Sequence, residues 1–146
     1  EALTTYQEAL AILQEVGDRA GEGTILNNIA FVYDELNEDE TALTSYQQAL
    51  AIAQELGLRH SEANTTYFIG EVYVELGQYS QALDTLQQSI PIFQETGQDN
   101  RLEDVQRWIT NALDGLSQTL SPTDYQQRCL AVSQTSGFPL AALCPE

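Results

Sequence analysis

Lysine and methionine are both absent from this chain of 146 residues, and its five basic residues are all arginine. Its 22 acidic residues leave a formal net charge of −17 at pH 7. Such a surface repels phosphate backbones and anionic lipid headgroups, so we expect neither nucleic acid nor a membrane as partner. A basic or apolar protein segment would be attracted instead, although acidic faces also serve solubility alone.

Long apolar runs are missing as well. No stretch of about 18 apolar residues could form a membrane-spanning helix, and no basic segment followed by an apolar one opens the chain. Because the chain lacks methionine and begins within a helical pattern, we expect further residues to precede residue 1. The compartment stays open, with the cytoplasm as the default.

Signatures of catalysis and of metal binding are also lacking. The one histidine, His60, follows a helix-ending segment, and neither a phosphate-binding glycine loop nor a nucleophile motif accompanies it. An acidic run between Asp34 and Glu40 lacks the alternating ligands and turn glycine of an EF-hand, so we interpret it as a solvated turn. We therefore expect no enzymatic activity, no cofactor and no metal site.

A repeat of 40 residues runs through the chain and is its strongest feature. The step relates Leu10, Leu50, Ile90 and Leu130. It also relates two further sets, Ala9, Ala49, Ser89 and Cys129, and Gly17, Gly57, Gly97 and Gly137. A fixed period of about 20 to 50 residues is typical of solenoids, whose units stack because each is too small to bury its own apolar face.

Each repeat splits into two predicted helices. The first ends where Asn37, Gly77 or Ser117 follows, and the second ends at the periodic glycine, because Asn and Gly tolerate the left-handed backbone that closes a helix. We predict an unpaired helix at 2–16 and helix pairs at 20–36 with 39–56, 61–76 with 79–96, and 101–117 with 122–135. Ser121 and Pro122 are typical of an N-cap and a first-turn proline. Pro91 falls inside a predicted helix, which it should bend.

Large and small residues alternate in register between the repeats. One unit has Leu26, Asn28, Ile29, Ala30, Tyr33, Ala42, Tyr46 and Ala49, and the next has Ile69, Gly70, Tyr73, Ala82, Leu83 and Ile90. This pattern resembles the tetratricopeptide repeat, in the longer 40-residue variety found in bacterial multi-repeat proteins. The resemblance implies an all-α, right-handed superhelical solenoid of about three antiparallel helix pairs plus an unpaired N-terminal helix. Its units would be residues 1–17, 18–57, 58–97 and 98–137.

In the family that the chain resembles, the first helix of each pair lines a concave surface that holds a peptide. The resemblance implies a groove made of Asn27, Asn28, Phe31, Asp34, Glu35, Asn64, Tyr67, Phe68, Glu71, Val74, Glu75, Asp104, Arg107, Trp108, Asn111 and Asp114. Six acids in this set face one arginine, which argues against a site for a peptide's terminal carboxylate. We expect an apolar segment with basic flanks, held by aromatic and cation–π contacts. The alternative is that Phe68 and Trp108 pack between helices.

The C-terminal tail, residues 138–146, begins where a further first helix would start. We expect this apolar tail to cap the open end of the solenoid, while insertion into its own groove is the alternative. A disulfide between Cys129 and Cys144 would staple the cap and favour a location outside the cytoplasm. In a reducing cytosol both would stay free thiols, with Cys129 a small buried residue.

These patterns together predict a scaffold for protein–protein interaction that binds a basic or apolar partner. Two alternatives stay open. One is a structural element that self-associates through its open N-terminal end, and the other is a regulatory segment of a larger multidomain protein. The partner's identity does not follow from the fold, because a solenoid is a platform for many functions.

Overall fold

The computed structural model describes residues 1–145, and within that range the chain is helical with no strand. The elements are α1 (Ala2–Val16), α2 (Arg19–Glu35), α3 (Asp39–Glu55), α4 (Arg59–Glu75), α5 (Tyr79–Glu95), the 3₁₀ turn η1 (Asp99–Arg101), α6 (Leu102–Ser117), α7 (Pro122–Ser136) and α8 (Leu140–Leu143). Among these described helices, none combines the length and apolar character needed to cross a membrane. The predicted helix pairs are all present.

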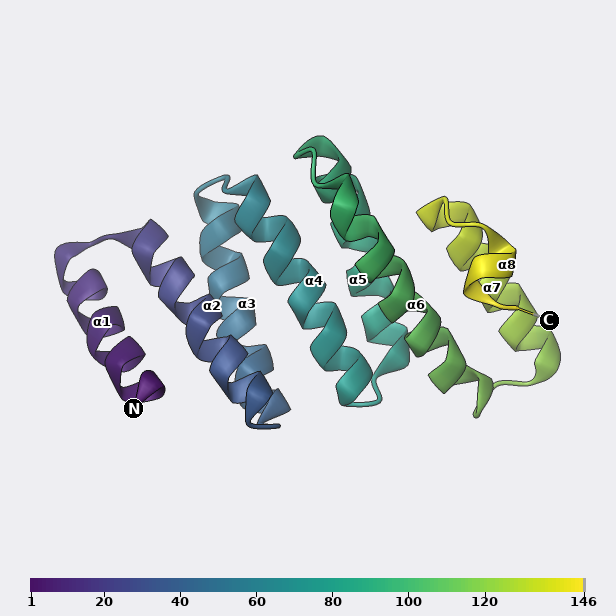
Figure 1. Cartoon of the computed structure of the whole chain (residues 1–146), viewed down its shortest axis with the longest axis horizontal. Helices are drawn as coiled ribbons and strands as arrows, with labels where there is room; N and C mark the ends of the chain where they lie inside the picture. The colour runs from purple at the N-terminus through teal and green to yellow at the C-terminus, as the bar shows by residue number, and fades with distance from the viewer. Residues whose placement is uncertain (146) are drawn as a thin grey trace.

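The helices stack along a row in two layers (Figure 1). One layer holds α2, α4 and α6, and α3 and α5 lie behind it. Each pair packs within itself, α2 on α3 and α4 on α5, and then against its neighbour, α3 on α4 and α5 on α6. Consecutive helix pairs that pack in this way confirm the predicted all-α solenoid.

The turns between helices share one backbone geometry. Asn37 has a φ of 57°, and the periodic glycines Gly17, Gly57, Gly97 and Gly137 have φ values between 65° and 78°. Residues other than Gly and Asn rarely adopt this left-handed backbone conformation, which explains why Gly and Asn recur at these turns. Ser117 does not follow the pattern, because it is the last residue of α6, and Gln118, which follows it, has right-handed backbone.

Two proline positions behave differently. Ser121 accepts a hydrogen bond from the backbone N–H of Asp124 at 3.2 Å, so the N-cap predicted ahead of Pro122 is confirmed. Pro91 lies within α5, which continues past it to Glu95.

The recurring small residues are buried in the core. Ala49, Ser89 and Cys129 share one repeat position, and each is at most 2% exposed. Ala42 and Ala82 share another, and both are fully buried. Because a larger side chain at these places would push neighbouring helices apart, the small residues set the helix spacing.

The N-terminal end of the row is thinly packed. α1 contacts α2, and its Leu10 packs against Leu26 and Ile52, yet no residue of α1 is buried. Ile12 and Val16 are 60% and 70% exposed. An apolar stripe of α1 therefore faces solvent.

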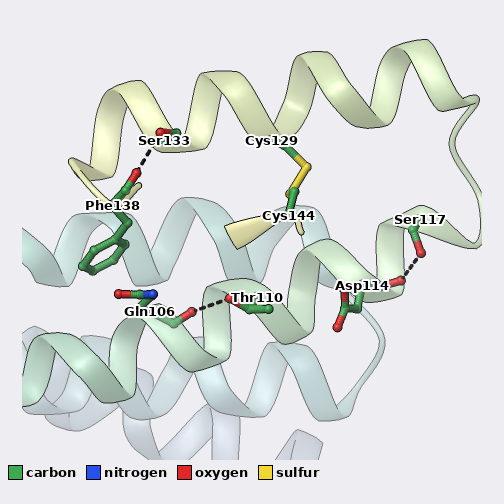
Figure 2. Close-up of a disulfide and its surroundings, with 8 residues drawn as sticks. All are labelled: Gln106, Thr110, Asp114, Ser117, Cys129, Ser133, Phe138 and Cys144. Atoms are coloured by element: carbon green, nitrogen blue, oxygen red, sulfur yellow. Dashed lines mark hydrogen bonds between the residues drawn. A yellow bond between two sulfur atoms is a disulfide. The ribbon is translucent and has the colours of Figure 1, made fainter. Parts of the chain in front are cut away.

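The opposite end is closed by the tail. α8 packs against α6 and α7, and Leu143 is fully buried there. Cys129 in α7 is joined to Cys144 by a disulfide with a Cα–Cα distance of 6.2 Å (Figure 2). The Ser133 hydroxyl also donates a hydrogen bond to the Phe138 carbonyl at 2.7 Å. Residues 138–145 thus cover the end of the row; residue 146 of the predicted tail lies outside the described residues.

Candidate binding groove

The predicted groove residues lie on α2, α4 and α6, which the fold places in one layer (Figure 1). The exposed ones are Phe31, Glu35, Glu75, Arg107, Asn111 and Asp114. The partly buried ones are Asn27, Asn28, Asp34, Asn64, Phe68, Glu71, Val74, Asp104 and Trp108. Tyr67 is only 4% exposed, so the prediction that its ring lines the groove is wrong, because the ring belongs to the core.

A pocket of about 230 Å³ lies between α2 and α4. Asn27, Asn28, Asn64 and Phe68 all line it. Inside it, the Thr65 hydroxyl donates a hydrogen bond to Oδ1 of Asn27 at 3.0 Å, which ties neighbouring first helices together. The pocket therefore offers amide groups beside an aromatic ring.

The aromatic residues continue from this pocket into the core. The ring of Phe68 stacks on Tyr46 of α3 with centroids 5.6 Å apart and meets the edge of Tyr67 at 5.4 Å. Tyr67 in turn meets Phe93 of α5 at 6.3 Å. Phe68 therefore packs between helices as well as bordering the pocket, whereas Phe31 is 50% exposed and free for a partner.

Two arginines lie near the start of α6, Arg101 immediately before the helix and Arg107 within it. Arg101, which sequence reasoning missed, places its guanidinium 4.7 Å from the ring centroid of Tyr67. It also approaches Asp104 at 3.9 Å, and Arg107 forms a second ion pair with the same carboxylate. Asp104 is thus compensated within the chain.

Asp34, Asp39 and Glu75 form an acidic cluster where α2, α3 and α4 meet. One carboxylate oxygen from each residue lies within 4.8 Å of the others. Asp34 and Asp39 flank the turn between α2 and α3, and Glu75 arrives from the end of α4. Oδ1 of Asp34 is buried and has no hydrogen-bond partner among the described residues. The interpretation of this segment as a solvated turn is therefore wrong at Asp34, because this side chain is partly buried beside Glu75 of α4.

The pKa values of the carboxyl groups here are raised. Burial raises the pKa of Asp34, and the charges of Asp39 and Glu35 add to the rise. Burial, followed by the charge of Asp34, raises the pKa of Glu75 to about 7. Burial also raises the pKa of Glu71. These three carboxyl groups therefore ionise less readily than exposed carboxyls, and a nearby positive charge would favour their ionised form.

A periodic ion-pair network lies outside the groove. Arg19 contacts Glu22 and Glu55, each at 2.7 Å, and 40 residues later Arg59 contacts Glu62 and Glu95, each at 2.5 Å. The step of 40 residues between the two sets of residues could have predicted this network from the sequence, although sequence reasoning missed it. The network occupies two of the five arginines with acids outside the groove.

A family model of the tetratricopeptide repeat matches residues 1–55 and again residues 40–95. The chain belongs to the tetratricopeptide repeat family. Among solved structures it is similar to a signal transduction ATPase with numerous domains from Pyrococcus horikoshii, which has a tetratricopeptide repeat sensor. The match has a TM-score of 0.68 and 20% identity and covers 95% of this chain. It covers 22% of that chain, and it shows a shared fold.

No curated protein sequence matches the chain significantly. Tetratricopeptide repeats generally mediate protein–protein interaction, and the fold is a non-catalytic scaffold. An interaction scaffold is therefore the general role of this tetratricopeptide repeat chain.

Proposed function

We propose that this tetratricopeptide repeat chain binds a protein segment with basic and apolar side chains on the surface of α2, α4 and α6. One observation carries the proposal. Among residues 1–145, the ion pairs leave Asp34, Glu35, Glu71 and Glu75 without an arginine. A partner's Arg or Lys would supply the missing positive charge, and electrostatic complementarity of this kind favours both association rate and specificity.

Apolar contacts would come from the same surface. Phe31 is half exposed, and the pocket beside Phe68 can take a side chain of moderate size. An aromatic anchor next to unpaired carboxylates suits an Arg or Lys whose aliphatic stem packs on the ring while its charged end reaches an acid. The surface therefore favours a segment in which basic and apolar residues are mixed.

The absence of lysine gives a direct test. Partners are captured from an extract of the source cells and joined to the chain with a zero-length carbodiimide, which links carboxylates to amines. Apart from its N-terminus the chain has no amine, so cross-links join its acids to lysines of the partner. We expect links at Glu35, Glu71 and Glu75, and none enriched at Asp84, an exposed acid of α5. Links confined to the α3 and α5 layer would refute the proposed surface.

A matched pair of variants checks the aromatic anchor. Phe31→Ala should weaken binding of the captured partner. Leu56→Ala removes a side chain of comparable exposure outside the groove and should leave binding unchanged. Each variant is compared by circular dichroism first, so that loss of binding is separated from loss of fold. Equal binding by both variants would remove Phe31 from the site.

A second candidate function is self-association through α1. The exposed Ile12 and Val16 form an apolar stripe that a second copy or another helix could cover. Sedimentation velocity over a range of concentrations should show larger species for the wild type and a single small species for Ile12→Ser/Val16→Ser. A chain that stays monomeric at high concentration would exclude this candidate. A regulatory role within a longer protein is a third proposal, since the chain spans 22% of the structural neighbour's length.

The disulfide supports a proposed location in an oxidising compartment outside the cytoplasm, where such bonds persist. Alkylation of thiols in freshly lysed source cells should leave Cys129 and Cys144 unmodified. Labelling of both would favour the cytoplasm.

A further inference from the structure

The acidic cluster has a geometry that the proposed function does not need. Asp34 comes from the last turn of α2, Asp39 is the first residue of α3, and Glu75 is the last residue of α4. Three chain segments therefore each direct one carboxylate to the same junction, with oxygens within 4.8 Å of one another. Like charges held so closely repel one another, so folding works against this arrangement unless a cation, or a proton shared between Glu75 and Asp34, offsets it.

A buried hydroxyl lies against the same junction. Tyr46 is 1% exposed, its ring packs with Ala30 of α2 and Val72 of α4, and its hydroxyl has no hydrogen-bond partner among the described residues. Ala30 lies one helical turn before Asp34, and Val72 lies one turn before Glu75, so Tyr46 packs beside the two helix ends that carry these carboxylates. A buried hydroxyl with no partner costs free energy, so it points to a group that completes the junction.

The next repeat provides an internal comparison. The positions 40 residues after Asp34, Asp39 and Glu75 hold Val74, Tyr79 and Gly115. There the Tyr79 ring occupies the space that a side chain on Gly115 would need. The fold therefore closes an equivalent junction with one aromatic ring and no charge. Three carboxylates in the preceding junction are thus not a requirement of the solenoid.

We propose that the junction of Asp34, Asp39 and Glu75 binds one Ca²⁺ ion. Ca²⁺ takes about 6–8 oxygen ligands at roughly 2.3–2.6 Å, so ligand oxygens lie up to about 5 Å apart across the ion. Three carboxylates within 4.8 Å satisfy this span and supply up to six oxygens, with water as the remainder. A divalent ion also offsets more of the three negative charges than one partner ammonium group would. Ion binding requires no protein partner, but Asp34 and Glu75 also belong to the proposed protein-binding surface, so Ca²⁺ and a partner's basic side chain would compete for them.

Sensitised luminescence of Tb³⁺, which takes Ca²⁺ sites, tests the proposal with the folded chain. Because Tyr46 lies beside the junction, excitation of tyrosine should produce Tb³⁺ emission that saturates at one ion per chain and is reversed by Ca²⁺. Tyr46→Phe should lower this emission and also weaken Ca²⁺ binding, measured by calorimetry, because it removes the unpartnered hydroxyl that the bound ion or its water would complete.

Asp39 and its control, Glu38, are neighbours at the start of α3, and Glu75 ends α4. Asp39→Asn and Glu75→Gln should each weaken Ca²⁺ binding by about tenfold or more, since each removes a charged ligand. Glu38→Gln changes the net charge equally, and Glu38 is exposed and outside the cluster, so it should retain wild-type affinity. Removing one of three repelling charges should not unfold the chain, which circular dichroism verifies.

Thermal unfolding gives an independent readout. Ca²⁺ should raise the Tm of the wild type and of Glu38→Gln but not that of Asp39→Asn. Three results would overturn the proposal: no saturable Ca²⁺ binding up to about 1 mM in physiological salt, an equal loss in Glu38→Gln and Asp39→Asn, or a junction that takes a lysine-containing peptide but not Ca²⁺. The first two would indicate diffuse charge, and the third a partner's side chain.

Discussion

The Tyr79 ring lies directly on the backbone of Gly115, and a Cβ atom at Gly115 would overlap three ring carbons. Tyr79 is the first residue of α5, and Gly115 lies in the last turn of α6. The absence of a side chain at Gly115 therefore allows the two helices to approach. In a solenoid this contact matters, because each repeat is held mainly by its neighbours.

Gly115→Ala should lower the free energy of unfolding by about 1–3 kcal/mol, because the ring must leave its place to admit the methyl group. Urea unfolding measures the loss. Tyr79→Leu/Gly115→Ala should be less destabilised than the sum of the single variants, since Leu lacks the overlapping ring atoms. As a control, Asn111→Ala on the exposed face of α6 should change the value by no more than about 0.5 kcal/mol. An additive double variant would show that the ring does not obstruct the methyl group.

The hydrogen bond between Thr65 and Asn27 predicts a second stability effect. Thr65 is 1% exposed, and its hydroxyl donates to Asn27 across neighbouring repeats. Thr65→Val keeps the shape and removes the donor, so the free energy of unfolding should fall by about 1 kcal/mol. Thr44→Val, whose hydroxyl only bonds its own helix on the surface, is the control. Equal values for the two variants would mean that the contact between repeats adds nothing.

The disulfide should stabilise the end of the row. Cys129 and Cys144 are 15 residues apart. A disulfide that closes a loop of this length raises the free energy of unfolding by about 3 kcal/mol, because it lowers the entropy of the unfolded chain. Cys129→Ala/Cys144→Ala keeps a small residue at the position of Ala49, so lost stability reports the bond and not a cavity. Urea unfolding of the variant, compared with oxidised wild type, measures it. Identical midpoints would show that α8 docks without the bond.

Glu71 predicts a dependence on pH. Burial raises its pKa, the charge of Asp34 adds to this, and the Tyr67 hydroxyl, the Trp108 indole and Arg101 oppose it. Because the folded pKa lies above that of the unfolded chain, the group favours folding at low pH, and this contribution is lost as the pH rises. Glu71→Gln should therefore match the wild type near pH 4 and exceed its stability increasingly toward pH 8.

Urea unfolding of both proteins across that range tests the sign. Glu103→Gln, an exposed acid on α6, controls for the change in net charge. A constant difference between Glu71→Gln and wild type at every pH would show that the titration of Glu71 is not linked to folding.

The repeat pattern predicted the elements well, for a local reason. The periodic glycines and Asn37 end helices through their own backbone preferences, and Ser121 begins one through its own hydroxyl. The sequence also predicted that the stripe residues lie on α2, α4 and α6, because residues on one helical face stay together however the helices pack. Whether Tyr67 or Phe31 faces solvent did not follow, since burial depends on which neighbouring helix covers the ring.

The sequence by itself determined the helix boundaries, the solenoid and the acidic character of this protein, since these depend on local backbone preference, a 40-residue period and a count of charges. Only the tertiary structure decided which acids meet. Asp39 and Glu75 are far apart along the chain, and they come together because α4 packs against α3, which begins at Asp39. The distance between two such side chains depends on how neighbouring repeats pack, so no spacing within one repeat could reveal it.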